Sequence, residues 1–191
     1  MFRGHASPHS LEEIDSDKDS PHVILQNLRL RNIDKIIIGH ININSIRNKI
    51  HLLADMIRGR VDILLISETK LDSSFPKPQF FIQGYSEPHR LDRTAFGGGL
   101  LFYFRDDIPI KPLPLISENI ECILSEITIS KKKWLFIGTY NSKKSLISSH
   151  LSTLEVSLCH YLASYDNVIM CGALTKLRVC EWVGCWTMSN F

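Results

Sequence analysis

The order of apolar and polar positions in the first third of the chain predicts a β-α-β unit. The apolar run at residues 36–43 is typical of a strand that is buried on both faces. Apolar residues then recur over residues 46–57 with the spacing of one helix face, and Ser45 can cap that helix. A second apolar run, at residues 61–66, predicts another buried strand. Because a helix joins the two strands, we expect them to be parallel.

The rest of the chain is organised differently. Four further strands are predicted from apolar runs that are separated by turns rich in Pro, Gly and Lys, with no helix between them. They should therefore pair antiparallel or divide between two sheets. Leucines at helical spacing predict a second helix, and one more buried strand follows it, which gives a mixed α/β layered domain. The predicted strands are residues 80–85, 99–105, 120–129, 133–140 and 167–171, and the helix covers residues 151–162.

The composition is that of a globular protein. The chain has 191 residues, of which 44% are hydrophobic and 22% are charged, and this suits one domain. No run approaches the roughly 18 apolar residues that a membrane helix needs, so we expect no membrane partner. The first residues lack the apolar core of a signal peptide, and five cysteines without a framework spacing favour a reducing compartment. We therefore expect an intracellular location, in the nucleus or the cytoplasm.

The net charge of +2 conceals an asymmetry along the chain. Residues 1–20 hold five acidic and two basic side chains, a balance of −3, so the remaining residues carry +5. The same segment has few large apolar residues and should be disordered. The positive surplus elsewhere permits a polyanionic partner without requiring one.

Polar side chains close the two strands of the predicted β-α-β unit. Asn42 lies at the end of the first strand, and Glu68 follows the second. Ligands in open α/β sheets collect beyond the carboxyl ends of parallel strands, and amide and carboxylate oxygens suit Mg²⁺ rather than zinc. By spacing alone, Glu68 also fits a solvated acid that opens a loop, and Asn42 fits a strand-to-helix turn.

Four short motifs occur in order along the chain. They are Asn42 with the following Ile46-Arg47, the step Glu68-Thr69-Lys70, the stretch YSEPHRLDRTAFGGGLLFYFRDDIP with its arginines and three glycines, and the strand KKKWLFIGTYNS that contains Tyr140. Together they resemble the endonuclease/exonuclease/phosphatase superfamily. More narrowly, they are similar to the apurinic-type endonuclease domain of non-LTR retrotransposons of the jockey and LINE kind. The resemblance extends over residues 33–172.

This resemblance implies a fold and a division of the chain. The fold would be the four-layer α/β sandwich of the endonuclease/exonuclease/phosphatase type, mostly its N-terminal half. Residues 1–32 would be a disordered leader, residues 33–172 an incomplete domain, and residues 173–191 a tail unrelated to the family. A domain that lacks much of its second half should leave an apolar sheet face uncovered, which would favour association.

The resemblance also implies a reaction and the residues that serve it. The family hydrolyses phosphodiester bonds and nicks target DNA with Mg²⁺, and its domain is usually fused to a reverse transcriptase, which is absent here. Asn42, Glu68 and Tyr140 would be catalytic, and Glu68 would hold the metal. The backbone of DNA would be contacted by Lys70, Arg93, Lys143 and Lys144.

The chain departs from the family where its next motif should stand. The family has Gly-Asp-x-Asn after the second helix, whereas this chain has Gly172-Ala173-Leu174-Thr175. Residues 176–191 contain no Asp and no His for the Asp-His pair that the family places later. Alanine cannot accept a proton from water, so we expect this chain to be inactive. Two alternatives stay open: a non-catalytic remnant with weak nucleic-acid binding, or another phosphodiesterase or phosphatase of the same superfamily.

Overall fold

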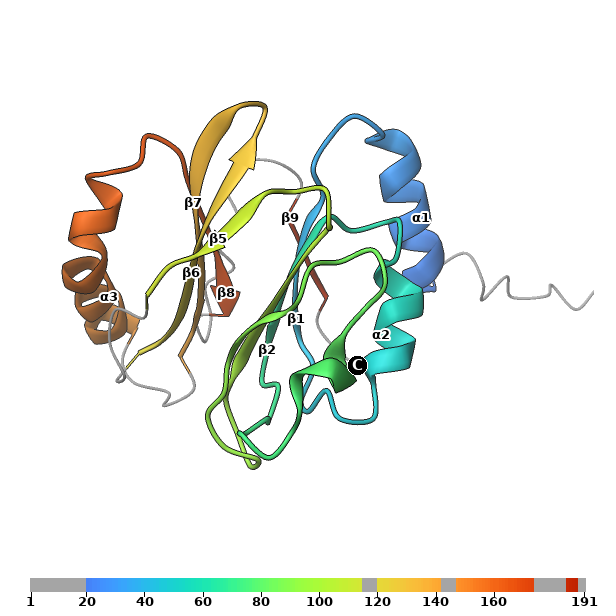
Figure 1. Cartoon of the computed structure of the whole chain (residues 1–191), viewed down its shortest axis with the longest axis horizontal. Helices are drawn as coiled ribbons and strands as arrows, with labels where there is room; N and C mark the ends of the chain where they lie inside the picture. Colours follow the sequence, from blue (N-terminus) through green and yellow to red (C-terminus); the bar gives the residue numbers. More distant parts are fainter. Residues whose placement is uncertain (1–19, 115–119, 142–146, 174–184, 189–191) are drawn as a thin grey trace, which may run out of the picture.

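The computed structural model describes residues 20–114, 120–141, 147–173 and 185–188 (Figure 1). The helices are α1 (Pro21–Arg31), α2 (Ile50–Ile57), the 3-10 helix η1 (Lys77–Phe80) and α3 (Ile147–Leu162). The strands are β1 (Ile38–Asn42), β2 (Ile63–Ser67), β3 (His89–Leu91), β4 (Leu100–Phe104), β5 (Ile110–Pro112), β6 (Glu121–Ile129), β7 (Lys132–Tyr140), β8 (Val168–Ala173) and β9 (Cys185–Met188).

Two mixed sheets face each other, and helices cover their outer faces. One sheet has the strand order β3-β4-β2-β1-β9, and the other has the order β5-β6-β7-β8. The predicted β-α-β unit is confirmed, because β1 and β2 pair in parallel with α2 between them in sequence. Helices α1 and α2 lie outside the first sheet, and α3 lies outside the second (Figure 1). The chain thus has the layered α/β architecture that its apolar pattern predicts.

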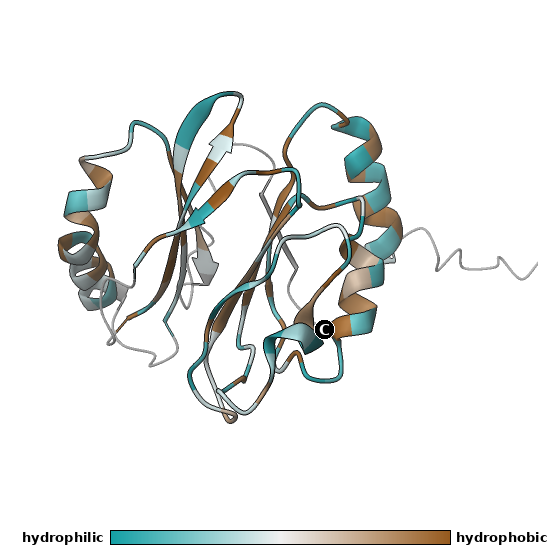
Figure 2. Cartoon of the chain, viewed as in Figure 1, coloured by the Kyte–Doolittle hydropathy of each residue, from teal (hydrophilic) through white to brown (hydrophobic). Residues whose placement is uncertain are grey.

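The main core lies between the two sheets. Phe102 and Phe104 of β4 meet Phe136 of β7 edge to face, with ring centroids 5.1 and 5.8 Å apart. Gly138 lets β7 come this close, since a Cβ there would lie 2.4 Å from Phe102 Cζ. Buried residues of both sheets form one cluster there, and Figure 2 shows hydrophobic residues along the strands of both sheets. Within the described residues the sheets therefore cover each other, which corrects the expectation of an uncovered apolar face.

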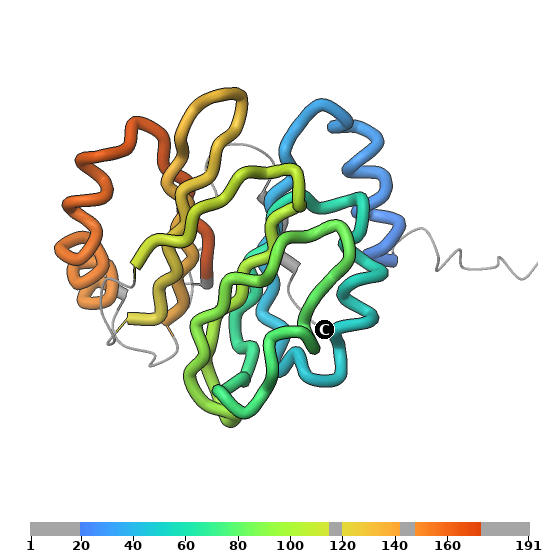
Figure 3. The backbone as a smooth tube through the Cα atoms, viewed as in Figure 1, coloured from blue at the N-terminus to red at the C-terminus, as the bar shows by residue number. Residues whose placement is uncertain are grey.

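Residues 21–31 correct the prediction that residues 1–32 form a disordered leader. They form α1, with Ser20 as its N-cap, and the helix lies beside α2 (Figure 3). Leu25 alone is buried in α1, so the apolar pattern carries little helix signal there. Residues 1–19 lie outside the described part of the chain. No helix in the described part is both long and apolar enough to cross a membrane.

The helix predicted to begin at Ile46 begins four residues later, at Ile50. Asn44 and Ser45 have positive φ values of 45° and 80°, which a right-handed helix does not allow. The backbone N–H of Ser45 instead donates to the carbonyl oxygen of Glu68 at 2.8 Å. The loop after β1 is therefore tied to the loop after β2 before the helix starts.

Two other predictions differ from the structure. Residues 80–85 are not a strand: η1 ends at Phe80, and of the following residues Tyr85 alone forms a bridge, to Arg105. Residues 173–191, predicted to lie outside the domain, contain the last residue of β8 and the strand β9, which pairs in parallel with β1.

Candidate functional site

Strand ends from both sheets meet at one edge of the sandwich. Asn42 ends β1 and is in register with Ser67 at the end of β2. Because β4 runs antiparallel to β2, its first residue also lies at this edge. In the second sheet, Tyr140 at the end of β7 is in register with Ala173 of β8 and with Glu121 at the start of β6. The edge thus collects the ends of four strands and the beginnings of two others.

Glu68 joins the two sheets at this edge. Its carboxylate oxygen Oε1 accepts a hydrogen bond from the Tyr140 hydroxyl at 2.5 Å, and Oε2 accepts one from the backbone N–H of Gly98 at 3.1 Å. Burial first, and then the bond to Glu68, hold the pKa of Tyr140 well above its ordinary value. A hydrogen bond with Asn42 lowers the pKa of Tyr140 and places that amide in the same group. The structure therefore brings the three predicted catalytic residues together.

The backbone around Glu68 has conformations that side chains usually avoid. Glu68 and Lys70 have φ values of 58° and 54°, and Asn44 and Ser45 on the facing loop are also positive. Lys70 Nζ donates to Asn44 Oδ1 at 2.5 Å and bridges the two loops. Non-glycine residues in the left-handed region store conformational energy and cluster at functional sites. The strain here is therefore an independent sign that this edge is a site.

A second carboxylate, Glu121, lies beside this group. Its Oε1 accepts from Arg93 Nη1 at 2.6 Å, and its Oε2 accepts from the backbone N–H of Gly99 at 2.8 Å. Glu121 is not among the predicted site residues, because ligands were expected at the carboxyl ends of parallel strands and Glu121 opens a strand. Since β6 is antiparallel to β7, its beginning lies at the same edge. An acidic residue that opens an apolar strand was the available signal.

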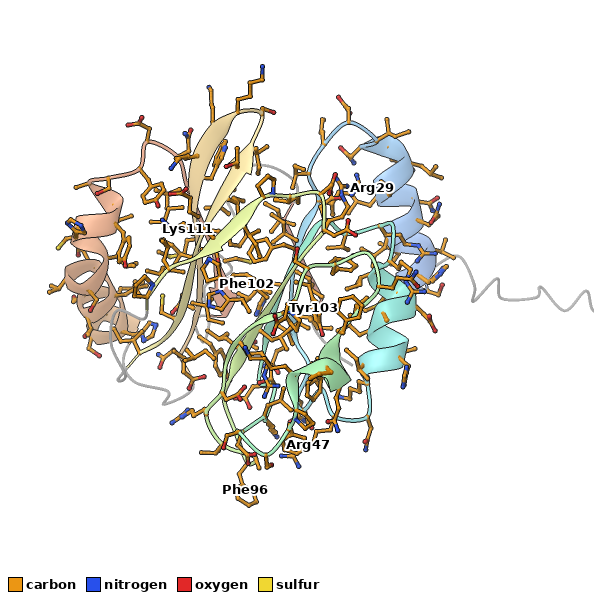
Figure 4. The ribbon with its side chains drawn as sticks, viewed as in Figure 1. Arg29, Arg47, Phe96, Phe102, Tyr103 and Lys111 are labelled. Carbon is orange, nitrogen blue, oxygen red and sulfur yellow. The ribbon has the colours of Figure 1, made fainter. Side chains whose placement is uncertain are left out.

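The structure describes two of the four residues that are predicted to contact DNA. Lys70 is half-buried at the edge and bonded to Asn44, and Arg93 is paired with Glu121. The loop between Arg93 and the glycines carries Phe96, which is 92% exposed and extends away from the body of the protein (Figure 4). Lys143 and Lys144 lie outside the described residues. Contact of these cations with DNA stays a prediction.

The oxygen atoms at this edge fit a hard divalent cation. Glu68 supplies a carboxylate, and the side-chain oxygen of Asn42 accepts from the backbone N–H of Asn44 at 3.2 Å. Mg²⁺ keeps several waters and often takes one or two carboxylates together with a substrate phosphate, so this small donor set suffices. Among the described residues, no three or more His, Cys, Asp or Glu side chains form a group that could enclose a metal. The donors therefore suit an open Mg²⁺ site rather than a closed zinc site.

Comparisons with known proteins bear on the fold. No family model matches the chain, and no curated protein matches it. Among solved structures, the chain is similar to a 3'-5' exonuclease (NExo) from Neisseria meningitidis, with a TM-score of 0.52 and 16% identity over 71% of this chain and 56% of that one. It is also similar to the endonuclease domain of TRAS1, a telomere-specific non-LTR retrotransposon, with a TM-score of 0.52 and 12% identity over 72% and 58%.

A third similar structure is a mannosyl-6-phosphatase from Bacteroides thetaiotaomicron, with a TM-score of 0.53 and 12% identity over 72% of this chain and 64% of that one. The chain thus spans about 56 to 64% of the length of these three proteins. At such identities the likeness concerns the fold alone, so it does not distinguish a nuclease from a sugar phosphatase. The chain therefore has a fold similar to that of these three proteins over 71–72% of its length.

Proposed function

We propose that this chain is the N-terminal part of a Mg²⁺-dependent phosphodiesterase domain, of the endonuclease type carried by non-LTR retrotransposons. We further propose that the chain as it stands binds DNA without cutting it. The contact of Tyr140 with Glu68, with Asn42 in the same hydrogen-bonded group, is the observation that carries the proposal. Three residues that the motifs single out, from three strands and two sheets, meet at one point.

Glu68 and Asn42 would hold the cation. Both present hard oxygen atoms at the carboxyl ends of neighbouring parallel strands, and Asn42 is exposed there. When bound, Mg²⁺ acts as a Lewis acid that stabilises negative charge on phosphoryl oxygens. Each oxygen of Glu68 accepts a hydrogen bond, and these two bonds hold the carboxylate at this edge before a cation binds.

Tyr140 would donate a hydrogen bond to a phosphate oxygen. Its raised pKa keeps the phenol protonated at neutral pH, so the hydroxyl is a donor and not a base. The hydroxyl donates its one proton to Glu68 in this structure, so it would turn from Glu68 to the phosphate oxygen when a substrate binds. Lys70 and Arg93 would fix the DNA backbone from the rim of the same edge.

Ala173 is the reason to propose binding without cleavage. Its backbone is paired in register with Tyr140, so this strand end lies directly beside the site. The family motif has an aspartate here, whereas an alanine methyl group cannot accept a proton from an attacking water. General-base assistance is typically worth about 10²–10⁴-fold in rate.

The test is a plasmid-nicking assay that compares the chain itself with a chimera. We expect no Mg²⁺-dependent nicking of supercoiled DNA by the chain itself. A chimera in which the residues after Gly172 are replaced by the corresponding segment of a retrotransposon endonuclease should nick, and Glu68→Ala should abolish this. Nicking that survives Glu68→Ala, or a folded chimera that does not nick, would contradict the proposal.

The same chimera separates the substrate classes that the fold leaves open. Cleavage of a sugar phosphate in place of DNA would assign the site to a phosphatase of the superfamily.

The DNA affinity of the natural chain can be measured by fluorescence anisotropy. This affinity should fall as NaCl rises, because contacts with phosphates release counterions. Binding that is absent at low salt would contradict the DNA part of the proposal.

A further inference from the structure

We propose that Glu121, held by Arg93, is a positioning residue for Glu68, which it orients through the glycine turn of residues 97–99. The inference rests on the proposed function, in which Glu68 is the carboxylate of the reacting site. It adds a residue that none of the sequence motifs singles out. Glu121 would act by fixing the backbone that orients Glu68, without touching the substrate.

The contacts of Glu121 are those of a structural carboxylate. Its side chain is 11% exposed, and each of its oxygens accepts a hydrogen bond, Oε1 from Arg93 at 2.6 Å and Oε2 from the Gly99 N–H at 2.8 Å. Charge-assisted bonds of this kind are roughly twice as strong as neutral ones. With one oxygen bonded to Arg93 and the other to the Gly99 backbone, Glu121 is suited to hold the turn in place.

The turn fits tightly against this ion pair. Gly98 has a φ of +76°, and a Cβ there would lie 2.6 Å from Arg93 Cδ and 2.8 and 2.9 Å from the two oxygens of Glu121. The pair is therefore packed against the Gly98 backbone and does not merely lie near it. Any shift of the pair should move the turn with it.

The glycine turn sets the direction of the Glu68 carboxylate. The N–H of Gly98 donates to Glu68 Oε2 at 3.1 Å, while Tyr140 donates to Oε1 at 2.5 Å. Glu121 and Tyr140 are register partners on β6 and β7. The second sheet therefore holds Glu68 on both sides, directly through Tyr140 and through the turn by way of Glu121. Residues that orient a metal ligand in this way commonly change metal affinity by about 10–100-fold when they are replaced.

Amide hydrogen exchange of Gly98, followed by NMR, tests this role without any cation. In Glu121→Gln the new amide NH₂ cannot accept from both donors, so we expect the exchange of the Gly98 N–H to accelerate about 10-fold. Glu126→Gln is the matched control, because Glu126 is also on β6, bonded to Tyr165 at 2.6 Å and to Lys133 at 2.9 Å. It should leave Gly98 unchanged.

A second variant, Arg93→Gln, and a second measurement, Mn²⁺ affinity, separate an effect on the turn from a failure to fold and from an effect on the cation site. Arg93→Gln disturbs the same pair from its more exposed partner, and it should also accelerate Gly98 exchange if Glu121→Gln fails to fold. Mn²⁺ affinity, measured by electron paramagnetic resonance, should fall about 10-fold in either variant and stay unchanged in Glu126→Gln.

Unchanged Gly98 exchange in both variants would overturn the inference, whatever the Mn²⁺ data show. Faster exchange with weaker Mn²⁺ binding would support it. Faster exchange in a chain whose natural form binds no Mn²⁺ would support the positioning of Glu68 and overturn the proposed function. Faster exchange with unchanged Mn²⁺ affinity would overturn the claim that this positioning matters for the site.

Discussion

Glu68 has a positive φ and a half-buried carboxylate, and it is bonded to both sheets. A solvated acid at the start of a loop would need none of these features. The strained backbone of Glu68 and Lys70 costs about 1–2 kcal/mol per residue, and surrounding contacts must hold it in place. At the scale of single residues, these features favour Glu68 as a site residue over Glu68 as a solvated acid that opens a loop.

Gly98 provides a prediction at the same scale. Gly98→Ala should lower the free energy of unfolding by about 2–4 kcal/mol, because the methyl group would overlap Arg93 and Glu121 in addition to the cost of the positive φ. Gly84 is the matched control, with a φ of +87° and no atom within 4 Å of an added Cβ.

Gly84→Ala should therefore cost only about 1 kcal/mol. Urea denaturation of the two variants measures the difference. Equal losses of stability would show that the Arg93–Glu121 pair does not pack against the turn as described.

At the scale of elements, α1 is held by a buried carboxylate. Asp62, just before β2, is 1% exposed and accepts from the backbone N–H of Ile37 at 2.6 Å. It also forms ion pairs with Arg29 of α1 and with Arg105 after β4. One side chain therefore connects a helix, the strand β1 and the end of β4.

Removing the charge of Asp62 should separate these elements. Asp62→Asn leaves Arg29 without its anion, while Arg105 keeps Asp107, and we expect a loss of about 3–5 kcal/mol in the free energy of unfolding. Asp106→Asn, at an exposed carboxylate nearby, should stay within about 0.5 kcal/mol. Urea denaturation tests both, and equal stabilities would contradict the importance of the buried ion pairs.

The sequence predicts the strongly buried elements better than the exposed ones. Strands β1, β2, β4, β6, β7 and β8 and helix α3 have long apolar runs or repeats, and each is found close to its predicted position. Helix α1 has one buried residue, so its only strong signals are the Ser20 cap and Pro21. The delayed start of α2 depends on hydrogen bonds to the loop after β2, which no local pattern contains.

The candidate site could also be predicted only in part. Asn42, Glu68 and Tyr140 could be named from the motifs, but their convergence across two sheets could not, since periodicity does not say which sheet faces which. The position of Glu121 at the start of an apolar strand is visible in the sequence, but its role is not, because that role depends on Arg93, 28 residues away in sequence, and on the backbone of Gly99.

At the scale of the whole molecule, a half-buried histidine connects the two sheets. His89 of β3 lies in one sheet, and its Nδ1 is 3.1 Å from the hydroxyl of Ser125 on β6 in the other. Burial, and then Lys77, lower the pKa of His89 below its ordinary value. The folded chain therefore takes up this proton less readily than the unfolded chain does.

The sign of the pH effect follows from this difference. Below about pH 6.5 the unfolded state binds the proton first, so His89 should lower the free energy of unfolding as the pH falls. The urea midpoint should drop between pH 7 and pH 5, and His89→Asn should make the drop smaller. An identical pH dependence in both proteins would contradict the role of His89 between the sheets.

The most direct test of the account is whether the edge around Glu68 binds a divalent cation. Mn²⁺ titration of the natural chain, followed by electron paramagnetic resonance, should show one ion per chain that Mg²⁺ displaces. Glu68→Gln should abolish this binding, whereas Glu155→Gln, at an exposed carboxylate on α3, should leave it intact. Equal Mn²⁺ binding by the natural chain and Glu68→Gln, or none by either, would contradict the assignment of this edge as a metal-dependent phosphodiesterase site.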